Sequence, residues 1–300
     1  KELNELVSKN YPPAILLLAS NSIKGDECVK QDLSKAIKYL KNMQKEGLNL
    51  PKNLVKFSKE LLAETYIKTS DRDNFLKAKK LFDELLLDET NSDKYTIYLY
   101  KRLAYIEYTL KEYKYMNLWL LEAAKLDDIE SQINLSKNYI SGTGVEKNIE
   151  KAVYWLEKCV DKDKKCGENL GAIYMNINYK TAPNLDKAFI SYAKAVKLGS
   201  QKAKSFIDNR DEIEEFYSFM QSDEIQYKLV VEYLNKYIKK EELKNIFITN
   251  INQRDKEYDV FISLAHNNEE KVAKLVFLKN RHNYWFVKDF KIANSILTLR

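Results

Sequence analysis

Apolar residues along the first two thirds of the chain recur at the three- and four-residue spacing of amphipathic helices. Small or flexible residues stand among them at Ala36, Ala78, Met116, Ala152 and Ala188, which are 42, 38, 36 and 36 residues apart. A large aromatic ring follows each of these positions after three or four residues, and therefore lies on the same helical face. A repeat period in this range is typical of stacked pairs of helices.

Each repeat is predicted to be a hairpin of two helices. The rings that follow the small residues are Tyr39, Phe82, Trp119, Trp155 and Tyr192. Short polar side chains four positions before the small residues are expected to cap the second helices, because their oxygens accept hydrogen bonds from first-turn N–H groups. These residues are Asp32, Asn74, Asn148 and Asn184, whereas the remaining repeat lacks such a residue and has Glu112 at that position. Gly142 and Gly144 are predicted to supply the positive φ angles of a turn.

The pattern changes near residue 210. One or two amphipathic helices are predicted over 210–242. Alternating apolar residues then predict strands at 245–250, 258–265, 271–279 and 284–290, with a further strand at 294–299. Because a sheet cannot continue a helical stack, we predict two domains, 1–209 and 210–300. The expected fold class is mostly α, an α-solenoid of helix-turn-helix repeats followed by a small α+β domain with an antiparallel sheet.

The segment 135–159 carries the most specific pattern in the chain. It holds Leu135 and Tyr139 on the first helix, and Gly142 and Gly144 in the turn. This segment resembles the Sel1-like repeat, a helix-turn-helix unit related to the tetratricopeptide repeat.

The resemblance to Sel1-like repeats extends over about residues 11–205, as five hairpins, and is closest over 128–200. It implies a binding surface instead of an active site, and therefore a scaffold or adaptor whose partner is another protein or peptide. Proteins of this family are commonly bacterial, and many act in or beyond the cell envelope, where they assemble complexes or meet host proteins. The resemblance thus implies a periplasmic, cell-surface or secreted protein, with membrane proteins among its partners and a role in virulence. Regulation in the cytoplasm is the alternative.

Cys159 and Cys166 lie at the junction between two hairpins. Secreted, cysteine-rich Sel1-like proteins carry a Cys pair at this junction, so the resemblance implies a disulfide, although this chain has one residue fewer between the cysteines. The alternative is a pair of reduced, half-buried thiols. A disulfide would indicate an oxidising compartment. Cys28, which has no evident partner, is predicted to be a small buried hydrophobic residue.

Aromatic residues are unusually dense between positions 95 and 119. Tyrosine combines apolar area with a hydrogen-bonding hydroxyl and is favoured at protein interfaces. The candidate partner-binding residues are Tyr98, Tyr105, Tyr108, Tyr113 and Trp119. The alternative interpretation is that these rings fill gaps between poorly matched repeats. Basic residues that would attract an acidic partner are Lys101, Arg102, Lys111 and Lys114.

Composition and motifs argue against several other classes of protein. The chain has 300 residues, 45% of them hydrophobic, which is enough for a substantial core. Its 50 basic and 44 acidic residues give a net charge of +6, too weak an excess to indicate nucleic-acid binding. The two histidines, His266 and His282, have no cysteine or second histidine at a metal-binding spacing. We therefore predict no catalytic residues, no metal site and no cofactor.

A second hypothesis places a small-ligand site or an enzyme in the C-terminal part. The run 273–290 resembles the closing hairpin of cone-shaped domains similar to nuclear transport factor 2. That resemblance implies a pocket lined by Phe247, Phe261, Phe277 and Trp285, with His282 or Asp289 pointing inside. The chain starts at Lys1 without a methionine, so an upstream leader is also considered. The sequence gives no sign of the partner's identity or the oligomeric state.

Overall fold

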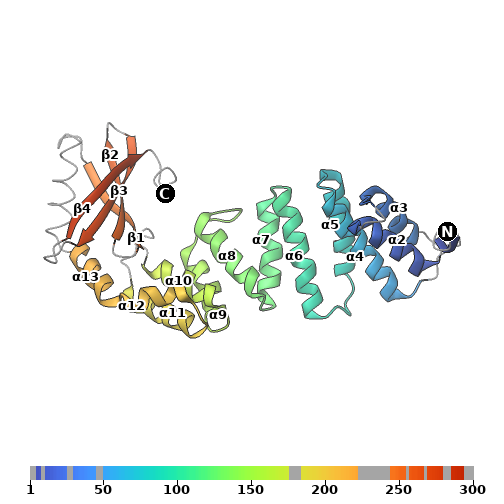
Figure 1. The fold of residues 1–300 in the computed structure, drawn as a ribbon, viewed down its shortest axis with the longest axis horizontal. Coiled ribbons are helices and arrows are strands. Elements are labelled where there is room, and N and C mark those ends of the chain that lie inside the picture. The colour runs from blue at the N-terminus through green and yellow to red at the C-terminus, as the bar shows by residue number, and fades with distance from the viewer. Residues whose placement is uncertain are drawn as a thin grey trace. The chain divides into compact units, whose positions relative to one another are not determined.

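The structure is a computed structural model that describes residues 5–7, 11–25, 30–44, 50–175, 184–221, 244–254, 257–266, 269–279 and 285–293. A series of helices is followed by a four-stranded antiparallel sheet (Figure 1). The chain divides into two compact units, Lys1–Ala152 and Val153–Arg300. The predicted fold class, helical repeats followed by a small α+β part, is confirmed.

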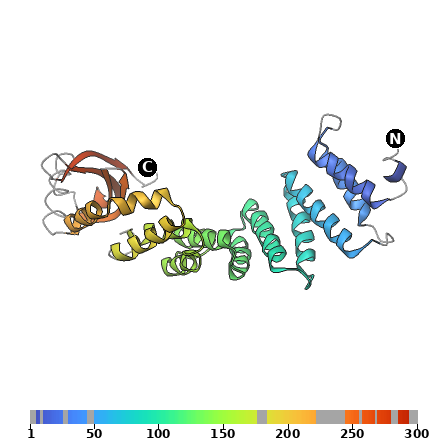
Figure 2. The same ribbon diagram turned by 60° about the horizontal axis from the view of Figure 1, so that its bottom comes forward.

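The first unit is a succession of helical hairpins. Its helices are α2 (Pro12–Lys24), α3 (Leu33–Met43), α4 (Lys52–Lys68), α5 (Arg72–Leu86), α6 (Asp93–Thr109), α7 (Tyr113–Lys125) and α8 (Ile129–Ser141). Each helix from α2 to α7 contacts the next one along the chain. Figures 1 and 2 show α4 beside α5 and α6 beside α7, as expected for stacked hairpins. Helix α9 (Ile149–Cys159) crosses the division between the units.

Packing within and between the hairpins follows the predicted pairing of small residues with rings. Ala36 and Ala78 are completely buried, and Met116 is buried as well. Phe82, on the same face of α5 as Ala78, is also completely buried and meets Tyr98 of α6 edge-on, with ring centroids 6.4 Å apart. The small residue lets the neighbouring helix approach, and the ring fills the space beside it.

The predicted helix caps are confirmed except for one. Asp32 caps α3 by accepting a hydrogen bond from the backbone N–H of Lys35 at 2.8 Å. The prediction that Asn74 caps α5 was wrong, because the cap is Asp71, which accepts a hydrogen bond from the N–H of Asn74 at 3.0 Å. Helix α4 ends at Lys68, so the chain can start the next helix earlier than expected.

Hairpins without turn glycines keep the same backbone geometry. Gly142 and Gly144 have φ angles of 77° and 69°, as predicted. Ser70 and Lys111 take φ angles of 55° and 65° in the turns that follow α4 and α6. A left-handed conformation is unfavourable for residues with a Cβ, so packing of the flanking helices must impose it.

The second unit combines the last hairpin with two further helices and the sheet. Its helices after α9 are α10 (Lys164–Met175), α11 (Leu185–Lys197), α12 (Gln201–Asp208) and α13 (Arg210–Gln221). The strands are β1 (Lys244–Arg254), β2 (Glu257–His266), β3 (Glu269–Lys279) and β4 (Trp285–Ala293), in the order β1-β2-β3-β4. All four predicted strands in this region are confirmed, and each is longer than expected. The predicted fifth strand at 294–299 and the helix beyond residue 221 lie outside the described residues.

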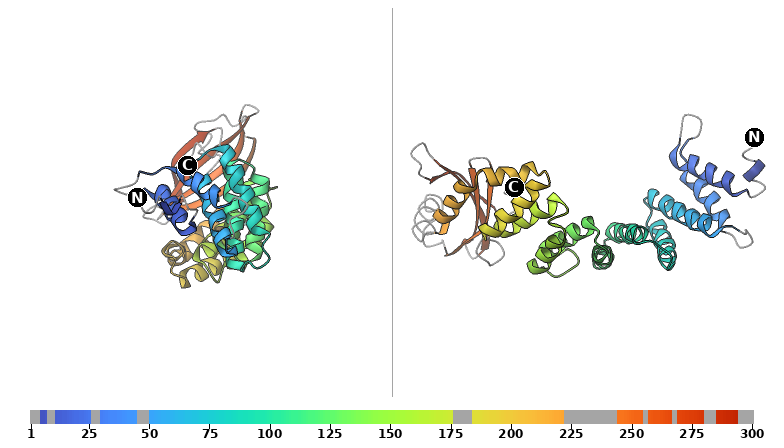
Figure 3. Two further views of the ribbon diagram at one scale, coloured as in Figure 1. Left: turned by 90° about the vertical axis from the view of Figure 1, so that its right-hand side faces the viewer. Right: turned by 90° about the horizontal axis from the view of Figure 1, so that it is seen from below.

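One hydrophobic core joins the helices and the sheet of the second unit. It contains Ala188 and Tyr192 of α11, Phe216 of α13, and Tyr258 and Phe277 of the sheet. The rings of Phe216 and Tyr258 stack with centroids 3.9 Å apart. Figure 3 shows the orange to red strands gathered beside the yellow and orange helices. The core thus runs across residue 210, and the division into domains 1–209 and 210–300 stays a prediction.

Candidate partner-binding groove

A groove of about 340 Å³ opens among helices α6, α7 and α8 of the first unit. Helices α6 and α8 are the first helices of successive hairpins, and α7 contacts both. The residues that line the groove are Lys101, Ala104, Tyr105, Tyr108, Met116, Leu120, Glu130, Ser131, Asn134, Lys137, Asn138 and Thr143.

One wall of the groove is aromatic. Tyr105 and Tyr108 lie one helical turn apart on α6, with 45% and 58% of their surface exposed. The ring of Tyr108 meets that of Tyr113 at a centroid distance of 6.0 Å. The guanidinium of Arg102 lies 5.2 Å from the centroid of the Tyr105 ring. Both groove tyrosines are therefore supported by neighbours while a large part of each ring faces solvent.

The floor of the groove is apolar. It is formed by Ala104 of α6 and by Met116 and Leu120 of α7, all of which are buried. The small side chain of Ala104 leaves space beside the two tyrosines, and the flexible thioether of Met116 can adapt to different shapes. Aromatic walls over an apolar floor are typical of sites that take up apolar side chains.

The opposite wall, on α8, is polar. Glu130, Asn134 and Lys137 are spaced by four and three residues and so share one face of the helix. The ammonium of Lys101 pairs with the carboxylate of Glu130 and lies 3.6 Å from that of Asp128. Burial alone would lower the pKa of Lys101, but the hydrogen bond to Glu130 and the two negative charges raise it. Lys101 is therefore positively charged at neutral pH, and its charge is balanced by the carboxylates of Glu130 and Asp128.

An amide network holds the end of the groove in place. Asn117 is buried, and its Nδ2 donates hydrogen bonds to the carbonyl oxygens of Tyr113 and Thr143, both at 2.8 Å. Its Oδ1 accepts a hydrogen bond from Nδ2 of Asn138 at 2.7 Å. The network ties the turn after α8 to α7. Gly144 packs against the start of α7 so closely that a Cβ there would lie 2.4 Å from the carbonyl carbon of Tyr113. Gly144 therefore permits this close approach in addition to supplying the positive φ angle predicted for it.

Of the five predicted partner-binding residues, the structure places Tyr105 and Tyr108 in the groove. Tyr113 supports Tyr108 from α7 but does not line the groove. Tyr98 and Trp119 lie elsewhere and serve packing between helices. The indole of Trp119 stacks on Tyr100 with ring centroids 5.8 Å apart.

Tyr98 belongs to a charged cluster between α4 and α6. Its hydroxyl donates a hydrogen bond to Oε1 of Glu64 at 2.8 Å, and Nη2 of Arg102 donates to Oε2 of the same carboxylate at 2.5 Å. Burial and the hydrogen bond to Glu64 raise the pKa of Tyr98. Two of the basic residues expected to attract a partner, Lys101 and Arg102, are thus already paired within the protein.

The polar wall of the groove was not predicted from the sequence. Lys137 is exposed and has no ion pair or hydrogen bond within the part of the chain that the structure describes. Asn134 is half-buried, and its side chain makes no hydrogen bond to the described residues. The spacing of Asn134 and Lys137 on α8 could have indicated a shared face, but not that this face opens into a cavity.

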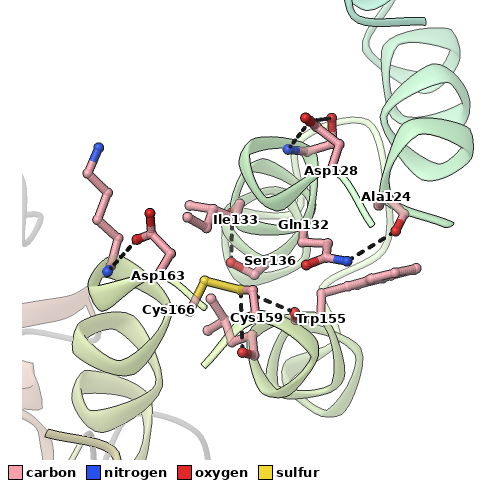
Figure 4. Close-up of a disulfide and its surroundings, with 12 residues drawn as sticks. Ala124, Asp128, Gln132, Ile133, Ser136, Trp155, Cys159, Asp163 and Cys166 are labelled. Atoms are coloured by element: carbon pink, nitrogen blue, oxygen red, sulfur yellow. Dashed lines mark hydrogen bonds between the residues drawn. A yellow bond between two sulfur atoms is a disulfide. The ribbon is translucent and has the colours of Figure 1, made fainter. Parts of the chain in front are cut away.

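Cys159 and Cys166 form a disulfide in the second unit (Figure 4). The bond joins the end of α9 to the first turn of α10, with Cα atoms 5.8 Å apart and both cysteines completely buried. In the intervening turn, Oδ1 of Asp163 accepts a hydrogen bond from the N–H of Lys165 at 2.7 Å. Cys28 lies outside the described residues.

The described residues contain no group of three or more His, Cys, Asp or Glu side chains placed to hold a metal ion. Within the same residues, no helix has the length and apolar character to cross a membrane. His282 and the side chain of His266 fall outside the description.

The pocket predicted for the C-terminal part does not assemble from its described rings. Tyr258, Val260 and Ile262 of β2 belong to the core on one face of the sheet, together with Phe277, which pairs with Tyr258. Phe261 alternates with these residues and therefore lies on the other face, where Nζ of Lys274 is 5.7 Å from its ring centroid. Phe261 and Phe277 cannot line one cavity.

Of the other residues predicted for that pocket, the structure describes the side chain of Asp289. Asp289 is exposed on β4, and its Oδ1 accepts a hydrogen bond from the N–H of Phe290. The side chains of Phe247 and Trp285 lie outside the described part of the chain.

Comparison with known proteins supports the repeat assignment. Residues 12–42 and 129–162 match the family model described as Sel1 repeat. A Sel1 repeat protein from Oxalobacter formigenes is similar, with 20% identity and a TM-score of 0.43 over 67% of this chain and 80% of that one. A protective antigen of uropathogenic Escherichia coli with an SLR fold has 14% identity and a TM-score of 0.38. That similarity covers 78% of this chain and 59% of the antigen.

No curated protein matches the chain in sequence. The family match does not extend to the C-terminal part, so the resemblance of that part to the nuclear transport factor 2-like fold stays a prediction. The hairpins α4–α5, α6–α7 and α10–α11 are not matched, although they keep the same helical pairing, so within 128–200 the match ends at residue 162. The chain contains Sel1 repeats, identified at residues 12–42 and 129–162.

Proposed function

We propose that this protein is a non-enzymatic interaction scaffold that holds a segment of a partner protein in the groove among α6, α7 and α8. Sel1 repeats generally mediate contacts between proteins. The observation that carries the proposal is the pair Tyr105 and Tyr108, two exposed rings that form one wall of a groove with an apolar floor. Large exposed rings beside an apolar depression are typical of the sites that dominate binding energy at protein interfaces.

The groove suits binding better than catalysis. Among the described residues, Glu130 is the one carboxylate that lines the groove, and it is paired with Lys101. The pKa of Lys101 is raised, so Lys101 cannot act as a base near neutral pH. The hydroxyls of Tyr105 and Tyr108 lie on an exposed wall, where water is not excluded. The alternative of a ligand pocket in the C-terminal part is weakened by the position of Phe261 and Phe277 on opposite faces of the sheet.

We further propose that the protein acts in the cell envelope of a bacterium or is secreted, with membrane or host proteins among its partners. The Cys159–Cys166 disulfide supports this location, because such bonds persist in oxidising compartments and are rare in the cytoplasm. A role in virulence rests on the family resemblance alone. Nucleic acid is not expected as a partner, since two of the basic residues around the groove are neutralised by Glu64 and Glu130.

The location is tested on protein isolated from its source without reductant. Alkylation of free thiols followed by mass spectrometry should leave Cys159 and Cys166 unmodified. Alkylation of both cysteines in the freshly lysed cell would contradict a site of action outside the cytoplasm.

The binding function is tested by photo-crosslinking in the source organism. A photoreactive phenylalanine analogue replaces Tyr108 in one variant and Tyr154 in the control. Tyr154 lies on α9 and is 50% exposed, so it is a matched ring outside the groove. We expect a discrete crosslinked protein from position 108 and none of that mass from position 154.

The crosslinked partner is then purified, and its affinity is measured for the native protein and for a Tyr105→Ala/Tyr108→Ala variant. Loss of two anchoring rings is expected to weaken binding at least about tenfold. Equal affinity of the two proteins, or identical crosslinks from positions 108 and 154, would refute the groove as the binding surface.

A further inference from the structure

We propose that the groove among α6, α7 and α8 is specific for an extended peptide segment that carries a carboxylate side chain a few residues from a large apolar side chain. This inference rests on the proposed scaffold function and adds the chemistry of the bound segment. It follows from which charges in the groove are compensated, which amides are unpaired, and where the apolar surface lies.

Charge compensation in the groove is uneven. At one end, Lys101 is neutralised by Glu130 and Asp128. At the other end, Lys137 is exposed and has no ion pair among the described residues. Glu130 and Lys137 are seven positions apart, which on a helix corresponds to about 10 Å along the axis. That distance is about one Debye length at moderate salt, so Glu130 compensates Lys137 weakly. Within the described part of the chain, the groove therefore presents one uncompensated positive charge to an occupant.

An unpaired amide stands between these two ends. Asn134 lies on the same face of α8 as Lys137, and its side chain makes no hydrogen bond to the described residues. An amide side chain carries donors and an acceptor, which match the N–H and C=O groups of an extended backbone. By contrast, the side-chain amide of Asn138 already donates a hydrogen bond to Asn117. Asn134 is thus placed to bind the main chain of a segment whose carboxylate reaches Lys137.

The apolar side of the groove lies across from these polar groups. Tyr105 and Tyr108 form its wall, and Met116 and Leu120 form its floor. A volume of about 340 Å³ lies at the lower end of the range for ligand pockets, and accommodates a few side chains instead of the surface of a folded domain. A large apolar side chain on the occupant would be buried against these residues.

The same features disfavour a nucleic acid or an anionic membrane surface. Each of these partners presents many negative charges and requires several free cations. Here Lys101 and Arg102 are both paired with carboxylates, and a third carboxylate, that of Asp128, lies 3.6 Å from the ammonium of Lys101. A single carboxylate on an otherwise apolar peptide matches this balance of charge.

The test uses a displayed library of random twelve-residue peptides and the full chain as bait. Parallel selections use a Lys137→Glu variant, a Tyr105→Ala/Tyr108→Ala variant and a Lys80→Glu control. Lys80 is exposed on α5, outside the groove, and has no ion pair in the described part of the chain, so it carries the same charge reversal without the proposed role. Thermal unfolding of each variant is compared with that of the native protein before selection.

The native protein and the Lys80→Glu control are expected to enrich peptides with Asp or Glu near a large apolar residue. For a synthetic peptide of this kind, Lys137→Glu should raise the dissociation constant about tenfold, because an attractive contact becomes a repulsive one. Replacing the acidic residue of the peptide with Lys should weaken binding to the native protein and restore binding to Lys137→Glu. The Tyr105→Ala/Tyr108→Ala variant should enrich none of these peptides.

Two results would overturn the proposal in distinguishable ways. Enrichment of peptides that depends on Tyr105 and Tyr108 but shows no acidic preference, or the same acidic preference in Lys137→Glu, would refute the inference and leave the scaffold function standing. Peptides that bind the tyrosine variant as well as the native protein, or no enrichment at all, would refute the groove as a binding site, and the inference with it.

Discussion

Replacement of Gly144 by alanine tests how the groove is held together. Gly144 has a φ angle of 69°, and an added Cβ would lie 2.4 Å from the carbonyl carbon and oxygen of Tyr113, at the start of α7. A left-handed φ costs a residue with a Cβ about 1–2 kcal/mol. The overlap is with backbone, so the turn and α7 must separate, which costs about 1–3 kcal/mol by analogy with overpacked cores. Alanine recovers about 0.5–1 kcal/mol of conformational entropy. The free energy of unfolding should therefore fall by about 1–4 kcal/mol.

Gly142→Ala is the matched control for this change. Gly142 has a similar φ angle of 77°, but its added Cβ would meet Cγ of Lys147 at 2.9 Å, a flexible side chain that can move away. Only the φ cost and the entropy gain apply, so the net loss should be about 1 kcal/mol or less.

The two glycine variants are compared by measuring native-state amide hydrogen exchange in α7 and α8. Local exchange is the appropriate measurement because the chain has two compact units and a single global transition is not expected. Gly144→Ala should also weaken peptide binding, since Thr143 lines the groove and its carbonyl is held by Asn117. If Gly144→Ala lowers protection no more than Gly142→Ala does, the close approach to Tyr113 is not a determinant of the fold.

Three further changes test other parts of the structure. Lys111→Gly should raise the free energy of unfolding of the first unit by about 0.5–1 kcal/mol in urea titration, because Lys111 has a φ angle of 65°, whereas Lys111→Ala should give no gain. Hydrogen bonds from the hydroxyl and the N–H of Thr90 lower the pKa of Asp88 from 3.8 to about 2. Since the folded-state pKa lies below the unfolded value, the stabilisation is complete above about pH 4 and is lost as the pH falls towards 2. A carbon-13 NMR titration should show a midpoint near pH 2, which Thr90→Val raises, and an unchanged midpoint would contradict the assigned contact. Reduction of Cys159–Cys166, which are seven residues apart, should destabilise the second unit by about 2–3 kcal/mol in chemical denaturation, with no effect of reductant on the double alanine variant.

The pairing of helices was predictable because it depends on short-range patterns. A small residue at Ala36, Ala78 or Ala188, with a ring three or four positions later, is sufficient to define the face that packs inside a hairpin, and all three alanines are completely buried. The four strands were predictable for the same reason, since alternation along each strand reflects one buried face.

The position of a helix cap was less predictable where several equivalent residues are adjacent. Asp71, Asp73 and Asn74 all have side chains that can cap a helix. The structure uses Asp71 because the chain turns at Ser70, whose left-handed φ angle is imposed by packing of α4 against α5. Local sequence does not encode that choice.

The groove was predicted in part for a related reason. Tyr98, Tyr105 and Tyr108 all lie on α6 and have similar intrinsic preferences. Tyr98 is held away from solvent by the hydrogen bond from its hydroxyl to Glu64, which lies 34 positions away on α4. Tyr105 and Tyr108 instead face the space left by Ala104 and α7. Which tyrosine becomes a binding residue thus depends on contacts between repeats, which no single helix reveals.

In the second unit, the sheet packs against the last hairpin and takes the place of the next hairpin in the repeat stack. A repeat stack exposes an apolar face at its last helix, and terminal elements must cover it. Here the ring of Phe206 on α12 stacks on Tyr192 of α11 at a centroid distance of 4.6 Å. The hydroxyl of Tyr217 on α13 donates a hydrogen bond to the carbonyl oxygen of Met175 at 2.8 Å, and the neighbouring Phe216 packs on the sheet. The strands therefore share the core of the last hairpin, and this accounts for the burial of Phe277 without any need for a ligand pocket on that face.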